Sequence, residues 1–376
     1  MGVRIRKSVL KKGITLFFLL SLAVMVGILL WTTESDTWTL LGRFRPEFIP
    51  LLFGLAALRW MVDGMAFVTM VKDHPRKVLT LRRAVEIRLQ GSLVANVLPV
   101  VLGSFTMHTY LLNKERLNLS ESMAMTVLRA VLPVFIFLVN IPILIFLGSD
   151  PRQETLFLRL MEVISLPMAL IIVFFTYTLF FPHRIKKAAS ALIRWWGRTR
   201  IIHMERVIAW EEKTFREVDQ FSRILWGYLR HRRGVIFRSA GWLSSAFLID
   251  YLIGLAIIWG FGIHPPWLYA VLLQCLMRPI IYLAPTPGGA GVWDLTYLGF
   301  FALYLPQSII GVAVLIWRLL ISYLPALAGA LVLVHEFRRD RRLKNILEKR
   351  GVFTDEELIL RGEKNLGSSG VPEDKR

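Results

Sequence analysis

The sequence predicts an all-α, polytopic integral membrane protein, and two observations support that prediction. Hydrophobic residues make up 55% of the 376 residues, with a mean hydropathy of +0.53, which is unusually apolar for a soluble protein. The formal net charge is nevertheless +19, because basic segments alternate with long apolar runs along the chain. Several of these runs reach the roughly 20 helical residues that cross about 30 Å of hydrocarbon.

About six apolar runs are long enough to be spanning helices. We expect them near residues 14–31, 48–71, 122–147, 156–181, 236–262 and 308–334. The basic amino-terminal segment before the first run suggests a signal peptide, but no small-residue cleavage site follows, so an uncleaved helix is expected. The single Cys275 excludes an intramolecular disulfide framework.

Two further apolar stretches, 84–112 and 267–304, are interrupted by proline and glycine. Basic segments indicate the cytoplasmic side, where we place both termini and segment 183–235. Counting sides from these anchors, 84–112 enters and leaves on the same side, as a re-entrant hairpin that turns within "NVLPVVLG", residues 96–103. The same count allows 267–304 to be either a hairpin or two short spans.

A hairpin at 267–304 would complete a repeated pattern. Span, hairpin and span would occur at 48–147 and again, with opposite orientation, at 236–334. This is the inverted-repeat plan of many transporters, whose sites lie where broken helices meet near the membrane midplane. We expect one transmembrane domain at 1–340, with a cytoplasmic, amphipathic and basic insert at 183–235. Residues 341–376 are expected to form a charged, partly disordered cytoplasmic tail.

Ionisable residues within apolar segments are costly and indicate candidate sites. Arg59 and Asp63 are four residues apart, share one helix face and can pair. The other such residues in or near apolar segments are Arg129, Asp250, Arg278, Asp294 and Arg318. These groups either form structural pairs or serve a ligand. The excess of arginine favours an anionic ligand, because a guanidinium is always charged and matches phosphate geometry.

The stretch "YLAPTPGGAGVWDL", residues 282–295, is a predicted break between two apolar helices. Pro287 prevents the preceding helix from continuing, and Gly288, Gly289 and Gly291 permit positive φ or close approach to a ligand. Irregular backbone at bilayer depth is tolerated only inside protein or beside water. The break is therefore either a ligand-facing turn within the membrane or a tight turn at its interface.

A helix that restarts at Gly291 would direct its free amides towards the turn, where an anion would bind. Asp294, in its first turn, would hold Arg278 or Arg318 in place or carry a proton. The turn of the first hairpin, with Asn96, would form the other half of the cavity floor.

Several classes of function are not supported by the sequence. The glycine-rich stretch lacks the spacing of a nucleotide-binding loop, and the histidines lack paired metal-ligand spacing, so no metal or cofactor is expected. Positive-inside bias already explains the basic charge, so no nucleic-acid partner is expected. The sequence does not determine the oligomeric state.

The order of segments, the stretch "PTPGGAGVWD" (285–294) and the Arg318 helix after it resemble the lysylphosphatidylglycerol synthase transmembrane-region family. This is the membrane domain of the multiple peptide resistance factor, which also occurs in stand-alone form, and the resemblance covers about residues 10–340. Asp294 stands where members commonly carry glutamate. The resemblance implies lipid handling, because this membrane part is thought to move aminoacylated phospholipid that a separate soluble domain makes. The charged tail after Val334 is too short for such a domain, so synthase activity is not expected.

The sequence therefore predicts a non-enzymatic, flippase-like translocase in the cytoplasmic membrane, for a phospholipid or other lipid with an anionic head group. Arg59, Arg129, Arg278 and Arg318 would receive that head group. Two alternatives remain open. One is a membrane-embedded transferase on a polyprenyl-phosphate or phospholipid carrier, with Asp63 or Asp294 as base. The other is a membrane scaffold for a separate lipid-modifying enzyme, docked through segment 183–235.

Overall fold

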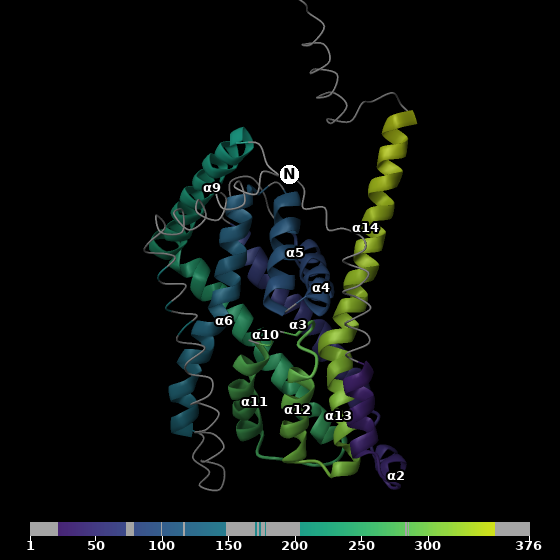
Figure 1. Cartoon of the computed structure of the whole chain (residues 1–376). Helices are drawn as coiled ribbons and strands as arrows, with labels where there is room; N and C mark the ends of the chain where they lie inside the picture. Colours follow the sequence, from purple (N-terminus) through teal and green to yellow (C-terminus); the bar gives the residue numbers. More distant parts are fainter. Residues whose placement is uncertain are drawn as a thin grey trace, which may run out of the picture. The chain divides into compact units, whose positions relative to one another are not determined.

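The computed structural model describes residues 22–72, 79–98, 100–115, 117–147, 204–282, 284 and 286–349, together with residues 170, 173 and 177 (Figure 1). These residues form helices, and no β-strand occurs among them. The chain divides into two compact units, Met1–Gly329 and Ala330–Arg376. The expected span at 156–181, apart from the three isolated residues, and the expected insert from 183 to 203 lie outside the described residues.

Four helices of the described chain are long and apolar enough to cross a membrane. They cover Phe48–Val71, Leu119–Phe137, Arg233–Gly260 and Gln307–Arg339. The first forms α3 (Phe48–Val71), and it exposes Phe53, Leu58 and Met61 on its outer face. Apolar side chains on the outside are what a helix in contact with lipid requires. The prediction of an all-α, polytopic membrane protein is therefore confirmed.

The other long helices are α6 (Leu119–Leu147), α10 (Arg233–Gly260) and a continuous helix formed by α13 (Gln307–Arg318), the π-helix η1 (Leu319–Tyr323) and α14 (Leu324–Lys349). The π-helix ends two residues before Pro325. A proline lacks an amide donor and collides with the carbonyl four residues earlier, so a locally widened turn accommodates it without ending the helix.

A shorter apolar helix, Leu22–Thr32, and α2 (Thr37–Leu41) precede α3. Both contact the start of α13. Thr37 Oγ1 donates to the carbonyl of Ser308 at 2.9 Å, and a Cβ on Gly311 would lie 2.2 Å from Thr32 Oγ1. The absence of a side chain at Gly311 thus allows the first described helix to pack closely on α13.

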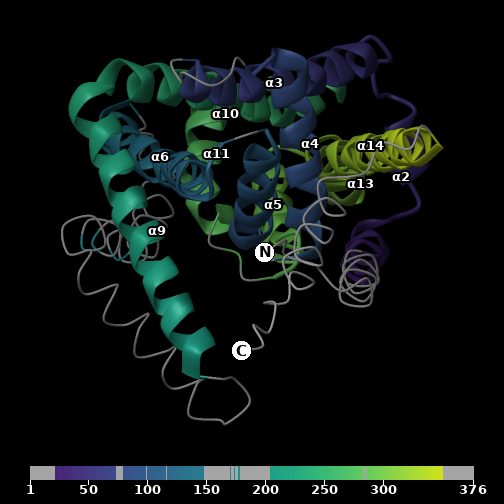
Figure 2. The ribbon, with the colours of Figure 1, turned by 90° about the horizontal axis from the view of Figure 1, so that it is seen from above.

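Helices α3 and α10 lie side by side in antiparallel orientation (Figure 2). Near one end the amide of Arg45 donates to the carbonyl of Gly260 at 2.8 Å. Near the other end Tyr228 Oη donates to the carbonyl of Met70 at 2.9 Å. Tyr228 belongs to α9 (Met204–His231), an amphipathic helix that meets α10 in a sharp bend at Arg232 (Figures 1 and 2). The carboxyl-terminal half of the expected amphipathic insert is therefore helical, as predicted.

The first hairpin consists of α4 (Leu81–Val97) and α5 (Val100–Lys114). The break follows Leu98, whose extended backbone, with ψ of 167°, is typical of a residue before proline. The two arms approach closely, because a Cβ on Gly103 would lie 2.5 Å from the carbonyl oxygen of Val94. A hairpin turning between residues 96 and 103 is thus confirmed.

The second hairpin consists of α11 (Trp267–Tyr282) and α12 (Val292–Ala302), which have 16 and 11 residues. At a rise of 1.5 Å per residue, α12 is only about 16 Å long, roughly half of what a membrane crossing requires. The helix lengths therefore favour a hairpin over two short spans.

The two hairpins approach each other from opposite ends of the larger unit, and their turns meet (Figure 1). The amide of Gly288 donates to the carbonyls of Ala95 and Leu98, at 3.1 and 3.3 Å. Ser322 Oγ, in the π-helix, donates to Asn96 Oδ1 at 2.7 Å. The broken segments at "NVLPVVLG" and "PTPGGAG" thus contact each other, as the sequence pattern predicted.

Candidate functional site

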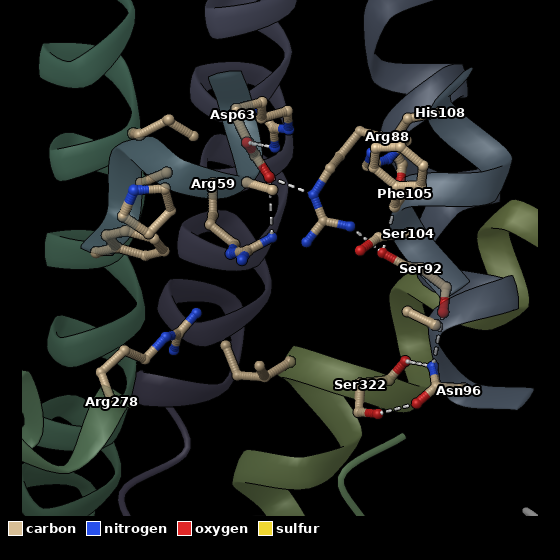
Figure 3. A pocket seen from close by; sticks show the side chains of 18 of the residues that line it. Arg59, Asp63, Arg88, Ser92, Asn96, Ser104, Phe105, His108, Arg278 and Ser322 are labelled. Atoms are coloured by element: carbon tan, nitrogen blue, oxygen red, sulfur yellow. Dashed lines mark hydrogen bonds and ion pairs between the residues drawn. The ribbon is translucent and has the colours of Figure 1, made fainter. Parts of the chain in front are cut away.

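A cavity of about 160 Å³, called the central cavity below, lies beside the contact between the two turns. Its walls come from both hairpins and from α3, α6, α10 and η1 (Figure 3). The polar lining residues are Arg59, Asp63, Arg88, Ser92, Asn96, Ser104, His108, Thr126, Arg129, Arg278, Gly288, Trp293 and Ser322. Arginine is the predominant charged residue in this lining.

Arg59 lies half-way along α3 and bridges two aspartates. Its Nε and Nη2 donate to the two carboxylate oxygens of Asp250 on α10, at 2.6 and 3.2 Å. Its Nη1 lies 3.5 Å from Asp63 Oδ2. The predicted pair between Arg59 and Asp63 is therefore present, but the shorter bonds of Arg59 are made to Asp250, on the other half of the chain.

Arginines from three helices contact the carboxylate of Asp63. Arg88 of α4 and Arg129 of α6 both donate to its carboxylate, in addition to the contact from Arg59. Arg88 also donates to Ser92 Oγ, one turn further along α4. Arg129 stacks on the ring of Phe67, with its guanidinium carbon 4.2 Å from the ring centroid. Asp63 thus orients the three cations around one side of the cavity.

Arg278 of α11 reaches the cavity from the opposite side to Arg88 (Figure 3). Its Nη2 donates to Asp250 Oδ2 at 2.8 Å. The guanidinium also lies over the rings of Phe247 and Trp293, at 4.9 and 5.5 Å from their centroids. Asp250 is fully buried and therefore ties α3, α10 and the second hairpin together.

Three of the lining arginines retain unused hydrogen-bond donors. The Nη1 atoms of Arg59, Arg129 and Arg278 are buried and have no hydrogen-bond acceptor among the described residues. A buried donor without an acceptor is costly, and most such donors in proteins are satisfied. These three groups lie in the walls of one cavity, so an anion in that cavity would satisfy them together.

The "PTPGGAG" turn adopts the backbone that its glycines permit. Gly288, Gly289 and Gly291 have φ of 59°, 64° and 82°, in the left-handed region that favours glycine. Its amides are already bonded within the protein. The donor and acceptor pairs are Gly288 with Ala95 and Leu98, Gly289 with Thr286, Ala290 with Pro287, Gly291 with Asp294, and Trp293 with Gly289.

The expectation that the turn presents bare amides to an anion is therefore wrong for these five residues. The physical reason is that the opposing hairpin and the turn itself supply carbonyl acceptors at close range. A Cβ on Gly289 would lie only 2.1 Å from Trp293 Cδ1, so this glycine is required by the turn and its own packing. The charged donors among the lining residues are arginine side chains.

Arg318 and Asp294 support the turn from outside the central cavity. Arg318 Nη2 donates to the carbonyl of Gly288 at 2.9 Å, and Arg318 Nε lies 3.4 Å from Asp294 Oδ1. Asp294 Oδ2 accepts the amide of Gly291 at 2.9 Å. Of the two partners expected for Asp294, the structure places Arg318 beside it and pairs Arg278 with Asp250.

The cavity brings together six of the eleven residues selected from the sequence. Those in its lining are Arg59, Asp63, Asn96, Arg129, Arg278 and Gly288. Those absent from its lining are Pro287, Gly289, Gly291, Asp294 and Arg318. The second group lies in the turn or holds it, so these residues position the site without lining it.

Sequence reasoning missed Arg88 and Ser92 and did not select His108 or Asp250 as site residues. Arg88, Ser92 and Asn96 are spaced by four, and such spacing places polar side chains on one face of a helix. That polar stripe within the predicted hairpin was the available signal for Arg88. His108 packs edge-on against Phe67, at 4.9 Å between ring centroids, and lines the cavity.

Residues 18–329 match a family described as the lysylphosphatidylglycerol synthase TM region. The chain belongs to this family. The match covers both hairpins, the first three candidate spans, most of the last one and the whole cavity lining. The resemblance noted in the sequence is therefore confirmed, and the protein carries a membrane domain of this kind.

A UPF0104 membrane protein of Archaeoglobus fulgidus is 19% identical to this chain over 341 residues, which cover 88% of this chain and 98% of the relative. No solved structure matches the chain. Within the described residues, no group of three or more histidine, cysteine or acidic side chains is arranged to hold a metal ion.

Proposed function

We propose that this protein translocates a lipid with an anionic head group across the cytoplasmic membrane. The central cavity is the observation that supports the proposal. It gathers four arginines from α3, α4, α6 and α11, and three of them have a buried donor that makes no hydrogen bond to the described residues. Uncompensated charge at bilayer depth is costly, so such a cavity favours an anion.

The arrangement of the hairpins supports translocation over simple binding. Span, hairpin and span follow one another twice, with α3 and α10 antiparallel, which fits an inverted repeat with both termini in the cytoplasm. In transporters of that plan, two states expose one central site to opposite sides. Only the head group needs the polar cavity, because the acyl chains can remain in the bilayer.

A transferase is less well supported by the geometry. Its candidate bases were Asp63 and Asp294. Asp63 is held by three arginines, and Asp294 accepts the amide of Gly291 and lies beside Arg318. Both carboxylates are thus engaged in structural contacts, and Asp294 does not line the cavity.

Reconstitution in liposomes tests the proposal. Lipids labelled on an acyl chain are distributed over both leaflets, and an impermeant reductant then quenches the outer label. We expect the protein to make the inner pool of an anionic lipid accessible, with the lipid recovered unchanged by mass spectrometry. Quenching at the rate of protein-free liposomes would contradict translocation, and a new lipid product would indicate the transferase.

A matched pair of variants on α4 adds specificity to this experiment. Arg88→Gln should slow anionic lipid movement about tenfold or more, because Arg88 lines the cavity. Arg82→Gln should leave the rate unchanged, because the Arg82 side chain is 88% exposed and lies on the same helix away from the cavity. Equal rates for both variants would argue against the cavity as the site.

A further inference from the structure

The central cavity has an excess of two positive charges. Its four guanidinium groups belong to Arg59, Arg88, Arg129 and Arg278. The two carboxylates bonded to them belong to Asp63 and Asp250. Arg318 and Asp294 lie behind the turn and offset each other. The described lining has no further lysine, arginine or acidic side chain, and a neutral His108 adds no charge.

The two excess charges are poorly compensated within the protein. Arg59 shares two carboxylates with three other arginines, and its Nη1 has only the 3.5 Å contact with Asp63, without a hydrogen bond. The Nη1 donors of Arg129 and Arg278 make no hydrogen bond to the described residues. In a medium of low dielectric, removing such an excess requires an equal number of negative charges close by. A ligand with one negative charge would leave one guanidinium uncompensated.

We infer that the central cavity binds a phosphomonoester lipid head group, which carries two negative charges, in preference to a phosphodiester, which carries one. This inference rests on the proposed function and specifies its substrate class. A monoester also presents three terminal oxygens, and three of the arginines that line the cavity each have a buried Nη1 donor that makes no hydrogen bond to the described residues. The two negative charges and three oxygens of a monoester therefore match the two excess positive charges and the three donors of these arginines.

The lining also indicates that the phosphate belongs to a lipid. Besides Thr126 and Arg129, helices α6 and α10 contribute apolar residues to the lining, and these are Ala130, Pro133, Leu243, Ala246 and Phe247. An apolar wall beside a polar pocket suits a head group with a hydrocarbon tail. The same charge count disfavours head groups with added amines, including one esterified with lysine, because they would bring more positive charge to the arginines.

Calorimetric titration of the purified full chain in neutral detergent tests the inference. The probes are dioctanoyl phosphatidic acid as the phosphomonoester lipid, dioctanoyl phosphatidylglycerol as the phosphodiester lipid, and glycerol 3-phosphate as the soluble monoester. At about pH 8 we expect phosphatidic acid to bind at least about tenfold more tightly than either of the others.

Lowering the pH should weaken the binding of the phosphomonoester lipid but not that of the phosphodiester lipid. The second ionisation of a phosphomonoester has a pKa of about 6, so the dianion takes up one proton as the pH falls past that value. Phosphatidic acid therefore loses one negative charge between about pH 8 and about pH 5, and its affinity for the protein should fall severalfold. Phosphatidylglycerol keeps its single charge over that range. Protonation of His108, the histidine that lines the cavity, would strengthen anion binding in acid, which is the opposite sign. A His108→Gln variant should therefore retain the fall in affinity.

Removal of one guanidinium should abolish the preference for phosphatidic acid over phosphatidylglycerol. In Arg278→Gln the excess falls from two charges to one, and phosphatidic acid and phosphatidylglycerol should bind within about threefold of each other. Arg88→Gln provides the same comparison should Arg278→Gln fold poorly. Arg82→Gln, with its exposed side chain, should retain the preference of the unmodified protein.

The outcomes separate the two proposals. Equal affinity for both lipids near pH 8, or an affinity for phosphatidic acid that does not change with pH, would overturn the monoester inference and leave anionic lipid translocation standing. Equal binding of glycerol 3-phosphate would overturn the assignment to a lipid. No binding of either lipid, together with no lipid movement in liposomes, would overturn the proposed function as well.

Discussion

Arg59 and Asp250 join the two halves of the chain through two hydrogen bonds between a planar guanidinium and a carboxylate, at 2.6 and 3.2 Å. The residues are 191 positions apart in the sequence, yet both lie mid-way along packed helices. Arg278 donates to the same carboxylate at 2.8 Å. Asp250 therefore fixes α3, α10 and the second hairpin relative to one another.

Asp250→Asn should destabilise the protein strongly. The substitution preserves the shape of the side chain but removes the charge that compensates two buried arginines, and breaking a buried ion pair typically costs about 3–5 kcal/mol. Thermal or denaturant-induced unfolding in detergent measures the change. Arg82→Gln is the control, because it removes an exposed pair and should cost less than about 1 kcal/mol. A loss of similar size in both variants would show that Asp250 does not hold the helices together.

Gly289→Ala should also be destabilising, for a reason of backbone geometry. At φ of 64° an alanine is strained, and its Cβ would lie 2.1 Å from Trp293 Cδ1, so we expect a cost of about 1–3 kcal/mol. Gly299→Ala on the same hairpin arm is the matched control. Nothing lies within 4 Å of a Cβ there and its φ is ordinary, so alanine should stabilise the helix by about 0.5–1 kcal/mol. Unfolding of both variants under the same conditions tests this contrast, and a tolerated Gly289→Ala would show that the turn is loosely packed.

Local features of the sequence were sufficient to predict most of the described fold. The span at 48–71 coincides with α3, because the length of an apolar run and the flanking charges set its ends. The first hairpin was predictable because proline and glycine interrupt its apolar stretch and counting sides from the basic segments places its two flanks on the same side of the membrane. The predicted contact between the two turns was also correct, since it followed from the repeated order of span and hairpin.

The hydrogen-bond and ion-pair partners of the site residues could not be predicted in the same way. Arg59 has an acid four residues away on its own helix, and only the tertiary packing brings Asp250 closer. The amides of the glycine-rich turn looked free because their acceptor, the carbonyl of Ala95, lies far away in the sequence. Arg88 follows closely on other basic residues in the sequence, which hides its role, although its spacing to Ser92 and Asn96 places it on the face of α4 that lines the cavity.

Arg318→Lys should separate the support of the turn from ligand binding. Arg318 contacts both the Gly288 carbonyl and Asp294, and a lysine ammonium cannot reproduce that planar, two-sided geometry. We expect a loss of about 1–3 kcal/mol in stability from the buried acceptors left without partners. Affinity for an anionic lipid should change by less than about threefold, because Arg318 does not line the cavity.

Arg278→Lys is the comparison, since Arg278 does line the cavity and a loss of affinity is expected there. Calorimetric titration and unfolding of both variants supply the two measurements. A large loss of affinity in Arg318→Lys without a loss of stability would return Arg318 to the role that the sequence suggested, as a direct contact of the head group.

Asn96 and Ser322 offer a way to test whether the hairpins must move. Their side chains share a hydrogen bond of 2.7 Å, and Asn96 Nδ2 also donates to the carbonyl of Ser322 at 3.3 Å. This contact joins the end of α4 to the π-helix at the edge of the cavity. A π-helix is a local irregularity that is frequent at functional sites, and alternating access requires the central elements to shift against each other.

We therefore expect the double variant Asn96→Cys with Ser322→Cys, in a Cys275→Ser background, to form a disulfide on oxidation, because the hydrogen bond between the two side chains shows that these positions face each other. Oxidation should stop lipid movement in liposomes, and a reductant should restore the rate of the reduced protein, since reduction frees the two elements again. The two single-cysteine variants control for the loss of the polar contact itself, and neither should respond to oxidation. If the cross-linked protein moved lipid as fast as the reduced one, separation of α4 from the π-helix would play no part in translocation, and the head group would have to pass while these elements stay together.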